Sequence, residues 1–379
     1  MKKFISLLMA FVMVLSLVAC GQPAADTSKT EEALSGETTG DTHIVVDHAG
    51  YEVEVPNQIE RIAVCNILPL PSVLAVFFDS AEKIVGMTEG SLTAAQNSLL
   101  GELYPELLEA ETGYFESNSV NVEELMKLNP DVVFYGKSDV EVGEQLRNAG
   151  FAAVAISVND WDYNAIETLD HWIALLGEIF PDNDKTEVVS AYSKQMYDLV
   201  QERVADIPDE ERERAFFLFK YSDTSIMTSG AKFFGQWWAD AIGAVNVAGE
   251  LTTDNSVAVN MEQVYAWNPS VILITNFTPA GPDDLYNNTV GVYDWSAIDA
   301  VQGRRVYKMP LGMYRSYTPG ADTPVTLLWL AKTIYPAYFE DVDILAETKA
   351  YYKEVFGVEL TDSQAESIFA PAADAGTGF

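Results

Sequence analysis

Few residues of this sequence offer the chemistry of a catalytic site. The three histidines, His43, His48 and His171, are scattered along the chain, and Cys65 has no motif around it. No G-x-S-x-G nucleophile elbow occurs. We therefore expect neither an enzyme nor a bound metal ion or cofactor.

Two fragments of ligand-binding motifs are incomplete. Residues 136–138 (Gly-Lys-Ser) match the end of a phosphate-binding loop, but the first glycine of that loop would fall on Asp131. Residues 160–164 imitate a calcium loop, yet Ala165 stands where glycine is needed and His171 where the closing glutamate belongs. Residues 160–164 are better suited to capping the helix that follows.

One pattern with a carboxylate at a fixed place occurs twice. Residues 120–135 and 259–274 share an Asn-x-Glu…Asn-Pro pattern, with Glu123 and Glu262 at equivalent positions. In each copy the first asparagine can cap a short helix, which ends before Asn-Pro. An apolar run follows that suits a buried parallel strand. The repeat predicts two similar α/β lobes.

The elements around the repeat alternate between strands and helices, which predicts parallel sheets. Residues 43–55 read as a hairpin that turns at 47–50. Residues 185–206 contain neither Gly nor Pro, and a helix there would span about 30 Å, enough to bridge two lobes. The boundaries that we expect are 1–19 for a signal peptide, 20–42 for a disordered tether, 43–183 for the N-terminal lobe, 184–207 for a connecting helix, 208–323 for the C-terminal lobe, 324–369 for helices packing across, and 370–379 for a frayed tail.

The charge balance limits the possible partners. The chain has 57 acidic and 22 basic residues, a formal net charge of −35. Nucleic acid is excluded as a partner, because neutralising phosphates needs patches of Lys and Arg. An apolar content of 48% supports well-formed cores and excludes global disorder.

The N-terminus has the pattern of an export signal. Lys2 and Lys3 precede an apolar run, 4–18, that is shorter than a membrane span. Residues 17–21 (Leu-Val-Ala-Cys-Gly) resemble a bacterial lipobox, which implies that Cys20 is lipidated and holds the protein on the outer face of the cytoplasmic membrane. The alternative is ordinary cleavage beside an incidental cysteine.

The order of motifs resembles the iron-siderophore, haem and cobalamin family of ABC-transporter substrate-binding proteins. The residues that carry the resemblance are 47–50, 55–56, 61–62, both copies of the repeat, 243–248, 295–307 and 328–336. The resemblance implies two Rossmann-like lobes with parallel sheets, joined by one long rigid helix, with a cleft between the lobes. It also implies a monomer that works with an ABC permease and ATPase.

In that family a glutamate on the rim of each lobe pairs with arginines of the permease, and the matching positions are Glu123 and Glu262. The alternative is that each glutamate only complements its own helix N-terminus. Glu124, at the capping-box position, is the weaker candidate for docking.

The ligand should lie on loops at the carboxyl ends of the strands. The candidates there are Asn66, Leu68, Tyr135, Lys137, Trp161, Tyr221, Phe234, Trp237, Tyr314 and Arg315. Trp237 and Trp238 are adjacent on a helix, so at most one should reach the cleft. Arg315 is the best partner for an anion or a carbonyl group, since its loop is flanked by Gly and Pro.

The resemblance implies import of a small-molecule metal complex, and a ferric siderophore is the first expectation. With so few histidines, a bare metal ion is not expected. Cobalamin, haem and an oxyanion such as molybdate remain alternatives, as does a surface sensor or adhesin that keeps the fold without transport.

Overall fold

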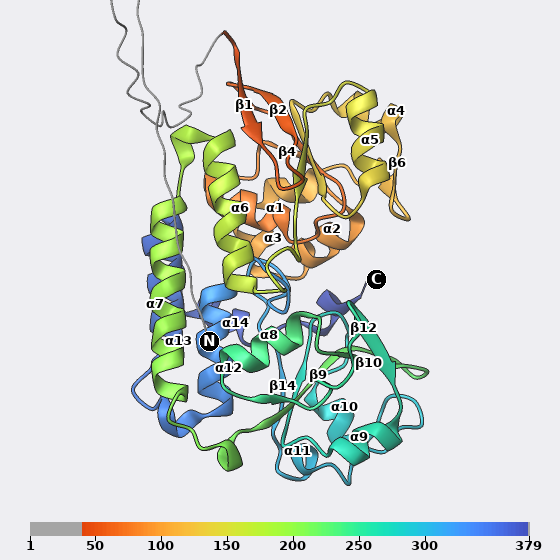
Figure 1. Cartoon of the computed structure of the whole chain (residues 1–379), viewed down its shortest axis with the longest axis vertical. Coiled ribbons are helices and arrows are strands. Elements are labelled where there is room, and N and C mark those ends of the chain that lie inside the picture. Colours follow the sequence, from red (N-terminus) through yellow and green to blue (C-terminus); the bar gives the residue numbers. More distant parts are fainter. Residues whose placement is uncertain (1–39, 378–379) are drawn as a thin grey trace, which may run out of the picture. The chain divides into compact units, whose positions relative to one another are not determined.

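The computed structural model describes residues 40–377, so the expected signal peptide, Cys20 and most of the expected tether lie outside the described residues. The N-terminal part, here the N-lobe, forms the upper half of Figure 1. It is built on a four-stranded parallel sheet in the order β4-β3-β7-β8. Its strands are β3 (Ile62–Val64), β4 (Ile84–Gly86), β7 (Val132–Gly136) and β8 (Ala153–Ile156). Its helices are α1 (Leu70–Phe78), α2 (Glu89–Gln96), α3 (Leu99–Leu103), α4 (Val122–Leu128), α5 (Val140–Asn148) and α6 (Ala165–Ile179).

Two small hairpins complete the N-lobe. The expected first hairpin forms from β1 (Thr42–Val46) and β2 (Glu52–Pro56), and a second one forms from β5 (Phe115–Glu116) and β6 (Ser119–Val120). Buried Asp47 holds the first hairpin in place, because its carboxylate accepts from the backbone N–H groups of Tyr51 and of Ala155 on β8, each at 2.9 Å. This carboxylate therefore joins the hairpin to the sheet.

The C-terminal part, here the C-lobe, has a mixed sheet in the order β12-β10-β9-β13-β14, with β11 beside β9. Strands β9, β11, β13 and β14 pair in parallel, whereas β10 pairs antiparallel with both of its neighbours, β9 and β12. The expected parallel pairing is present in β9, β11, β13 and β14. Strand β10 runs antiparallel because only residues 222–225 join it to β9, too short a link for a parallel crossover. The strands are β9 (Arg214–Tyr221), β10 (Ile226–Ser229), β11 (Val245–Asn246), β12 (Ser256–Val259), β13 (Val271–Ile274) and β14 (Val306–Lys308), and the helices are α8 (Phe234–Ala241), α9 (Met261–Trp267), α10 (Pro282–Asn287) and α11 (Asp299–Gln302).

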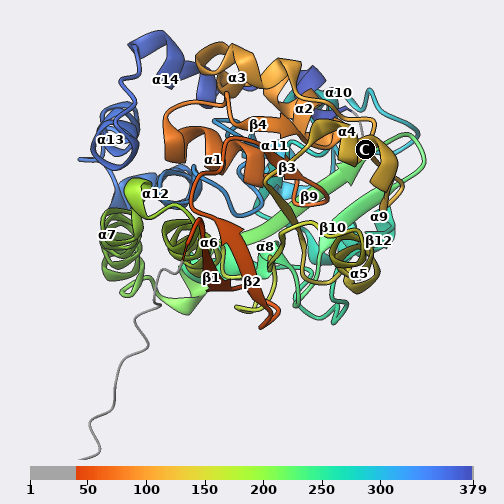
Figure 2. The ribbon, with the colours of Figure 1, turned by 90° about the horizontal axis from the view of Figure 1, so that it is seen from above.

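Helix α7 (Thr186–Val204) connects the two lobes and lies within the range 184–207 named from the sequence. It packs beside α6 and α12, and these helices gather at one side of both views (Figures 1 and 2). The remaining helices are α12 (Thr323–Ile334), α13 (Ile344–Tyr351), which continues as a turn of π-helix (Tyr352–Phe356), and α14 (Asp362–Ile368). None of the described helices combines the length and the apolar character needed to cross a membrane.

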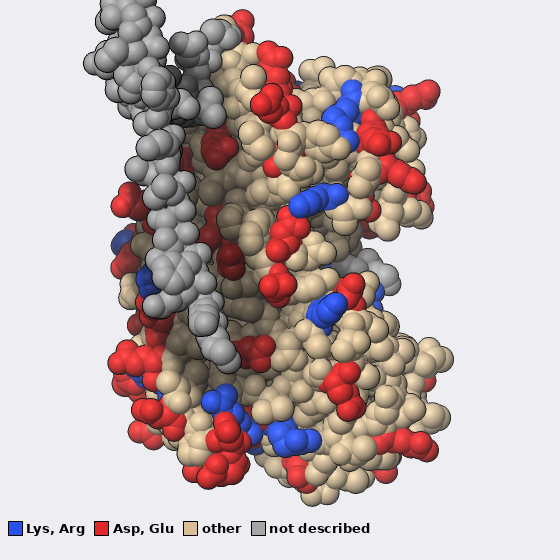
Figure 3. Space-filling model, viewed as in Figure 1, with Lys and Arg blue, Asp and Glu red and all other residues tan. Residues whose placement is uncertain are grey.

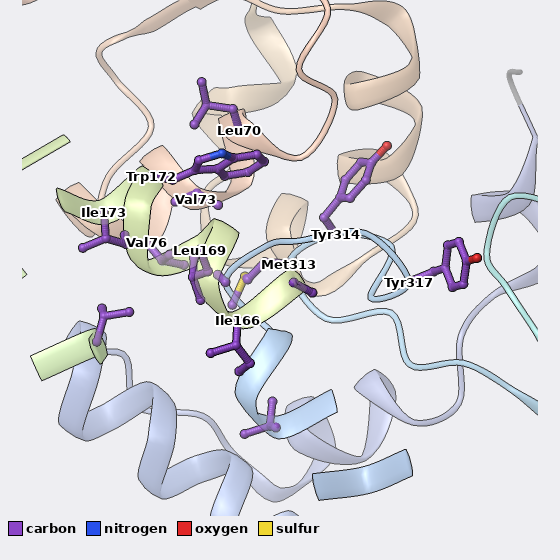
Figure 4. Close-up of a cluster of buried hydrophobic side chains, with 14 of the residues drawn as sticks. Leu70, Val73, Val76, Ile166, Leu169, Trp172, Ile173, Met313, Tyr314 and Tyr317 are labelled. Atoms are coloured by element: carbon purple, nitrogen blue, oxygen red, sulfur yellow. The ribbon is translucent and has the colours of Figure 1, made fainter. Parts of the chain in front are cut away.

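One hydrophobic core runs through both lobes. It joins the inner face of each sheet to α6, α7 and α12, while smaller clusters fill the outer faces. Figure 4 shows Met313, from the loop after β14, beside Ile166 and Leu169 of α6. The loop after the last strand of the C-lobe therefore packs directly against the N-lobe, and the prediction of a two-lobed α/β fold is confirmed.

The repeat forms as expected, with one difference in backbone conformation. Asn121 and Asn260 cap α4 and α9 by accepting from the N–H of the third helical residue, at 3.2 and 2.9 Å. The asparagines before proline, Asn129 and Asn268, end the helices in the left-handed region, at φ 44° and 39°. Asparagine reaches this region more readily than other residues with a side chain, so the helices end in a left-handed cap rather than in extended backbone.

Candidate functional site

The loops at the carboxyl ends of the strands enclose the space between the lobes, which we name the cleft. Figure 3 shows a hollow between the two lobes on the right of that view. On the N-lobe side a pocket of about 650 Å³ is lined by Asn66 and Leu68 after β3, the start of α2, and the β5–β6 hairpin. Asn66 accepts from the backbone N–H of Gly136 at 2.7 Å, which ties the β3 loop to the end of β7.

Arg315 is the central residue on the C-lobe side, and its side chain is 0% exposed. Its Nε and Nη2 donate to the carbonyl oxygen of Ala375 at 3.0 and 2.7 Å, and Nη1 donates to the hydroxyl of Tyr314 at 3.0 Å. The guanidinium also lies 5.1 Å from the ring centre of Phe277. Burial lowers the pKa of Arg315, yet a guanidinium stays charged in proteins, so a fixed positive charge stands at this end of the cleft.

Two lysines lie close enough to Arg315 for its positive charge to lower their pKa values. Burial, and then repulsion from Arg315, lowers the pKa of Lys220 at the end of β9. The pKa of Lys308 at the end of β14 falls to about 7, chiefly through burial. The Lys308 ammonium donates to the carbonyl oxygens of Thr275, Thr278 and Ala280 at 3.0, 2.6 and 2.7 Å, so it fixes the loop after β13. Three basic side chains thus converge in a chain of net charge −35.

Asp322 positions the loop that carries Arg315. Its carboxylate is buried and accepts from the backbone N–H groups of Met313 and Tyr314 at 2.9 and 3.3 Å, and from the hydroxyl of Tyr352. Burial raises the pKa of Asp322 to about 6. Because the loop is held by backbone hydrogen bonds, the position of Arg315 does not depend on a ligand.

Aromatic rings surround this positive region. Phe219 lies 5.0 Å from Phe277 and 5.5 Å from Tyr317, measured between ring centres. On the N-lobe, Tyr163 contacts the ring of Phe234 at 5.1 Å, and its hydroxyl donates to the carbonyl of Asp254 at 2.7 Å. Tyr163 therefore joins the two lobes beside the cleft.

The comparisons with known proteins agree with this architecture. Residues 84–311 match the family described as "Periplasmic binding protein". This chain belongs to that family. It is 27% identical over 337 residues to the molybdate-binding protein MolA of Haemophilus influenzae, which covers 83% of this chain and 90% of MolA.

Two solved structures are similar over most of the chain. One is a periplasmic solute-binding protein from Veillonella parvula, with a TM-score of 0.77, 28% identity, and coverage of 87% of this chain and 97% of that one. The other is MolA bound to molybdate, with a TM-score of 0.69, 26% identity, and coverage of 84% and 99%. The chain is therefore a solute-binding protein of an ABC transporter, and its relatives are binding proteins rather than enzymes.

Five of the residues named from the sequence lie at the cleft of this binding protein. Asn66 and Leu68 line the N-lobe pocket, and Phe234, Tyr314 and Arg315 lie in the C-lobe cluster. Phe234 and Tyr314 are almost fully buried, at 5% and 2% exposed, so the cluster presents little open aromatic surface.

Tyr135 and Tyr221 are placed differently from the expectation. Tyr135 packs on the outer face of the N-lobe sheet, where its hydroxyl accepts from Arg147 at 2.6 Å. Tyr221 lies in the outer cluster of the C-lobe, where its hydroxyl accepts from Trp295 at 2.9 Å. Neighbouring residues of a strand point to opposite faces, and these two point away from the inner core.

Lys137, Trp161 and Trp237 are only partly buried. Lys137 pairs with Asp160 at 2.6 Å, and Trp161 stacks on His171 with ring centres 4.1 Å apart. These two residues therefore brace the loop after β8. The neighbour of Trp237, Trp238, is fully buried, so at most one of the pair is open to the cleft, as expected.

The surroundings of His48 and Cys65 indicate that both residues have structural roles. His48 accepts from the backbone N–H of Ser157 at 3.1 Å, and burial lowers its pKa to about 4. Cys65 is buried after β3, which raises the pKa of its thiol to about 12. Among residues 40–377, no group of three or more His, Cys, Asp or Glu side chains is placed to hold a metal ion.

The sequence reasoning missed Lys220, Phe219, Tyr163 and Tyr317. One signal for Lys220 was present, because a lysine directly after the apolar run 215–219 of β9 is unusual in a buried sheet. The tail was also misjudged. Residues 373–376 form a 3₁₀ turn in which Ala375 is buried, so the tail is not frayed as far as residue 377.

The two glutamates of the repeat are exposed. Glu123 and Glu262 lie in the first turns of α4 and α9, and neither takes part in an ion pair or hydrogen bond with another residue of the described chain. Glu124, in contrast, pairs with Lys127 at 2.6 Å. Both repeat glutamates are therefore open to a partner.

Proposed function

We propose that this binding protein captures an anionic ligand in the cleft and delivers it to an ABC permease, and that the ligand is a small oxyanion of the molybdate class. The proposal is carried by Lys220 and Arg315, whose charged ends lie against the neighbouring rings of Phe219 and Phe277 in so acidic a chain. Lys308 adds a third basic side chain near Arg315. Charge-assisted hydrogen bonds to an anion are shorter and stronger than neutral ones. The same anion would offset the mutual repulsion of the basic side chains.

The similarity to MolA supports this ligand class, since that relative is a molybdate-binding protein and the match spans most of both chains. Within this cleft, Arg315 would offer fixed N–H donors to the ligand oxygens, and Lys220 would add a second positive charge. The buried aromatic rings would keep water away and so strengthen the attraction.

A ferric siderophore is the second candidate, favoured by the size of the N-lobe pocket. About 650 Å³ is more than one tetrahedral oxyanion fills, and it lies in the range of sites for organic ligands. Leu68 and Phe115 give that pocket apolar walls. A negatively charged ferric chelate would match the volume of the pocket and the positive charge of the basic side chains.

Calorimetric titration separates the two candidates. Molybdate, tungstate, sulfate and phosphate would be titrated into the protein in parallel with ferric hydroxamate and catecholate siderophores, haem and cobalamin. We expect stoichiometric binding of molybdate, and a loss of at least about tenfold in affinity in Lys220→Gln, because a charged hydrogen bond is worth roughly 1.5–3 kcal/mol. The control is Lys194→Gln, an exposed lysine on α7 that pairs with Asp198. Binding of a ferric chelate without any oxyanion would decide for the second candidate.

Membrane anchoring is proposed from the sequence, because Cys20 lies outside the described residues. We expect the Cys20→Ala protein to appear in the medium, since it would lack the lipid that holds the chain at the membrane. Cell fractionation measures this, and a Cys20→Ala protein that stays with the membrane would contradict the anchor.

A further inference from the structure

The end of the described chain lies on the basic side of the cleft. Arg315 donates to the carbonyl oxygens of both Ala375 and Thr377, at 2.7 to 3.3 Å. The turn from Ala373 to Gly376 also contacts α2, a wall of the N-lobe pocket. In Figure 1 the last described turn of the chain, in dark blue, lies between the two lobes. The tail thus reaches from one side of the cleft to the other.

We propose that residues 371–377 form an intramolecular cover over Arg315, which the ligand must displace to bind. This inference rests on the proposed function for the site. The carbonyl oxygens of the tail accept the same guanidinium hydrogens that the oxygens of an anion would accept. The tail is therefore a tethered competitor for the site.

The tail buries few side chains, so it could leave Arg315 without disrupting the core. Of residues 372–377, only Ala375 and Gly376 are buried, and neither has a large side chain. The root of the tail is fixed, because the carbonyl of Ile368 accepts from the backbone N–H of Leu311 at 2.8 Å. Release of residues 371–377 would thus leave α14 and the loop before Arg315 in place.

Gly376 offers a way to open the cover without removing it. A side chain at this position would overlap the carbonyl group of Thr278 and the nitrogen of Pro279. Those backbone atoms cannot move easily, because Lys308 holds the carbonyl of Thr278 at 2.6 Å. Gly376→Val should therefore unseat the tail. Ala373→Val adds a side chain of the same size at an exposed position and is the matched control.

The test compares the full-length wild type, Gly376→Val and Ala373→Val with two readouts. The first needs no ligand and measures the rate at which phenylglyoxal modifies Arg315, followed by mass spectrometry of the peptide. The second is the affinity for molybdate. We expect Gly376→Val to react about tenfold faster and to bind molybdate about tenfold more tightly, because binding no longer competes with the tail. Ala373→Val should match the wild type, and a chain ending at Ala370 should match Gly376→Val.

Equal modification rates of Arg315 in Gly376→Val and Ala373→Val would overturn the cover. So would equal molybdate affinities in chains that do bind molybdate, and the proposed function would survive that result. If no chain binds molybdate while Gly376→Val still reacts faster, the cover stands and the proposed oxyanion is wrong.

Discussion

At the scale of single residues, the site depends on a few buried charges held by the backbone. The Asp322 carboxylate fixes the loop before Arg315, and Lys308 fixes the loop that Phe277 occupies. Burial disfavours the charged form of both groups, so the pKa of Lys308 falls and the pKa of Asp322 rises. Titration of Asp322 should therefore be visible in the stability of the protein.

The pKa of Asp322 is about 6 in the folded protein, above the value of roughly 4 in an unfolded chain. The folded state therefore binds this proton more tightly. Its stabilising contribution is complete below about pH 4 and is lost as the pH rises through 6. We expect the unfolding free energy of the wild type, relative to that of Asp322→Asn, to fall by roughly 2–3 kcal/mol between pH 4 and pH 7.5. Urea unfolding at both pH values measures this, and a difference independent of pH would rule the titration out.

At the scale of elements, α4 and α9 present one carboxylate each on the two lobes. An anion near a helix N-terminus gains only about 0.3–1 kcal/mol, so removing Glu123 or Glu262 should change the stability of the protein little. Two exposed anions on separate lobes can fix the orientation of a partner with matching positive charges.

We expect Glu123→Ala and Glu262→Ala each to reduce uptake by cells several-fold while leaving ligand affinity unchanged, because neither side chain lines the pocket at the cleft. Uptake assays and calorimetry on the purified variants measure the two effects. Glu124→Ala is the matched control, since that side chain already pairs with Lys127 and should keep transport. Weakened ligand binding in the two test variants would remove the docking role.

At the scale of the whole molecule, the two lobes are held by a shared core and a stiff connection. Helix α7 buries Val189, Met196 and Val200 in that core. Near its end, Arg203 donates to both carboxylate oxygens of Asp341, at 2.6 and 2.9 Å. Movement of one lobe against the other would disturb this packing, so a large closure is disfavoured.

We expect ligand binding to change the radius of gyration by less than about 1 Å, because a helix without Gly or Pro lacks the flexible residues that hinges use. Small-angle scattering with and without saturating ligand measures this. The Gly376→Val protein serves as a control for any contribution of the tail. A compaction of several ångströms would show that the lobes move as hinged bodies.

Much of the architecture was determined by the sequence itself. The repeat, the helix caps, the turn at 47–50 and the lack of helix breakers across α7 are local patterns, and local backbone preferences act in the same way wherever the segment lies. The position of Arg315 on a loop at the carboxyl end of the C-lobe sheet followed from the order of the strands.

The tertiary structure alone decided which side chains share the cleft. Tyr135 follows a run in which every position is apolar and buried, and Tyr221 ends a strand whose positions on both faces are mostly apolar. The sequence therefore does not show which face each tyrosine takes. Lys220, Lys308 and Arg315 come from different elements and meet only when the sheet forms. The tail is a stretch of small and polar residues with no pattern of its own, and it is ordered by the hydrogen bonds of Arg315, a partner 60 positions away in the sequence.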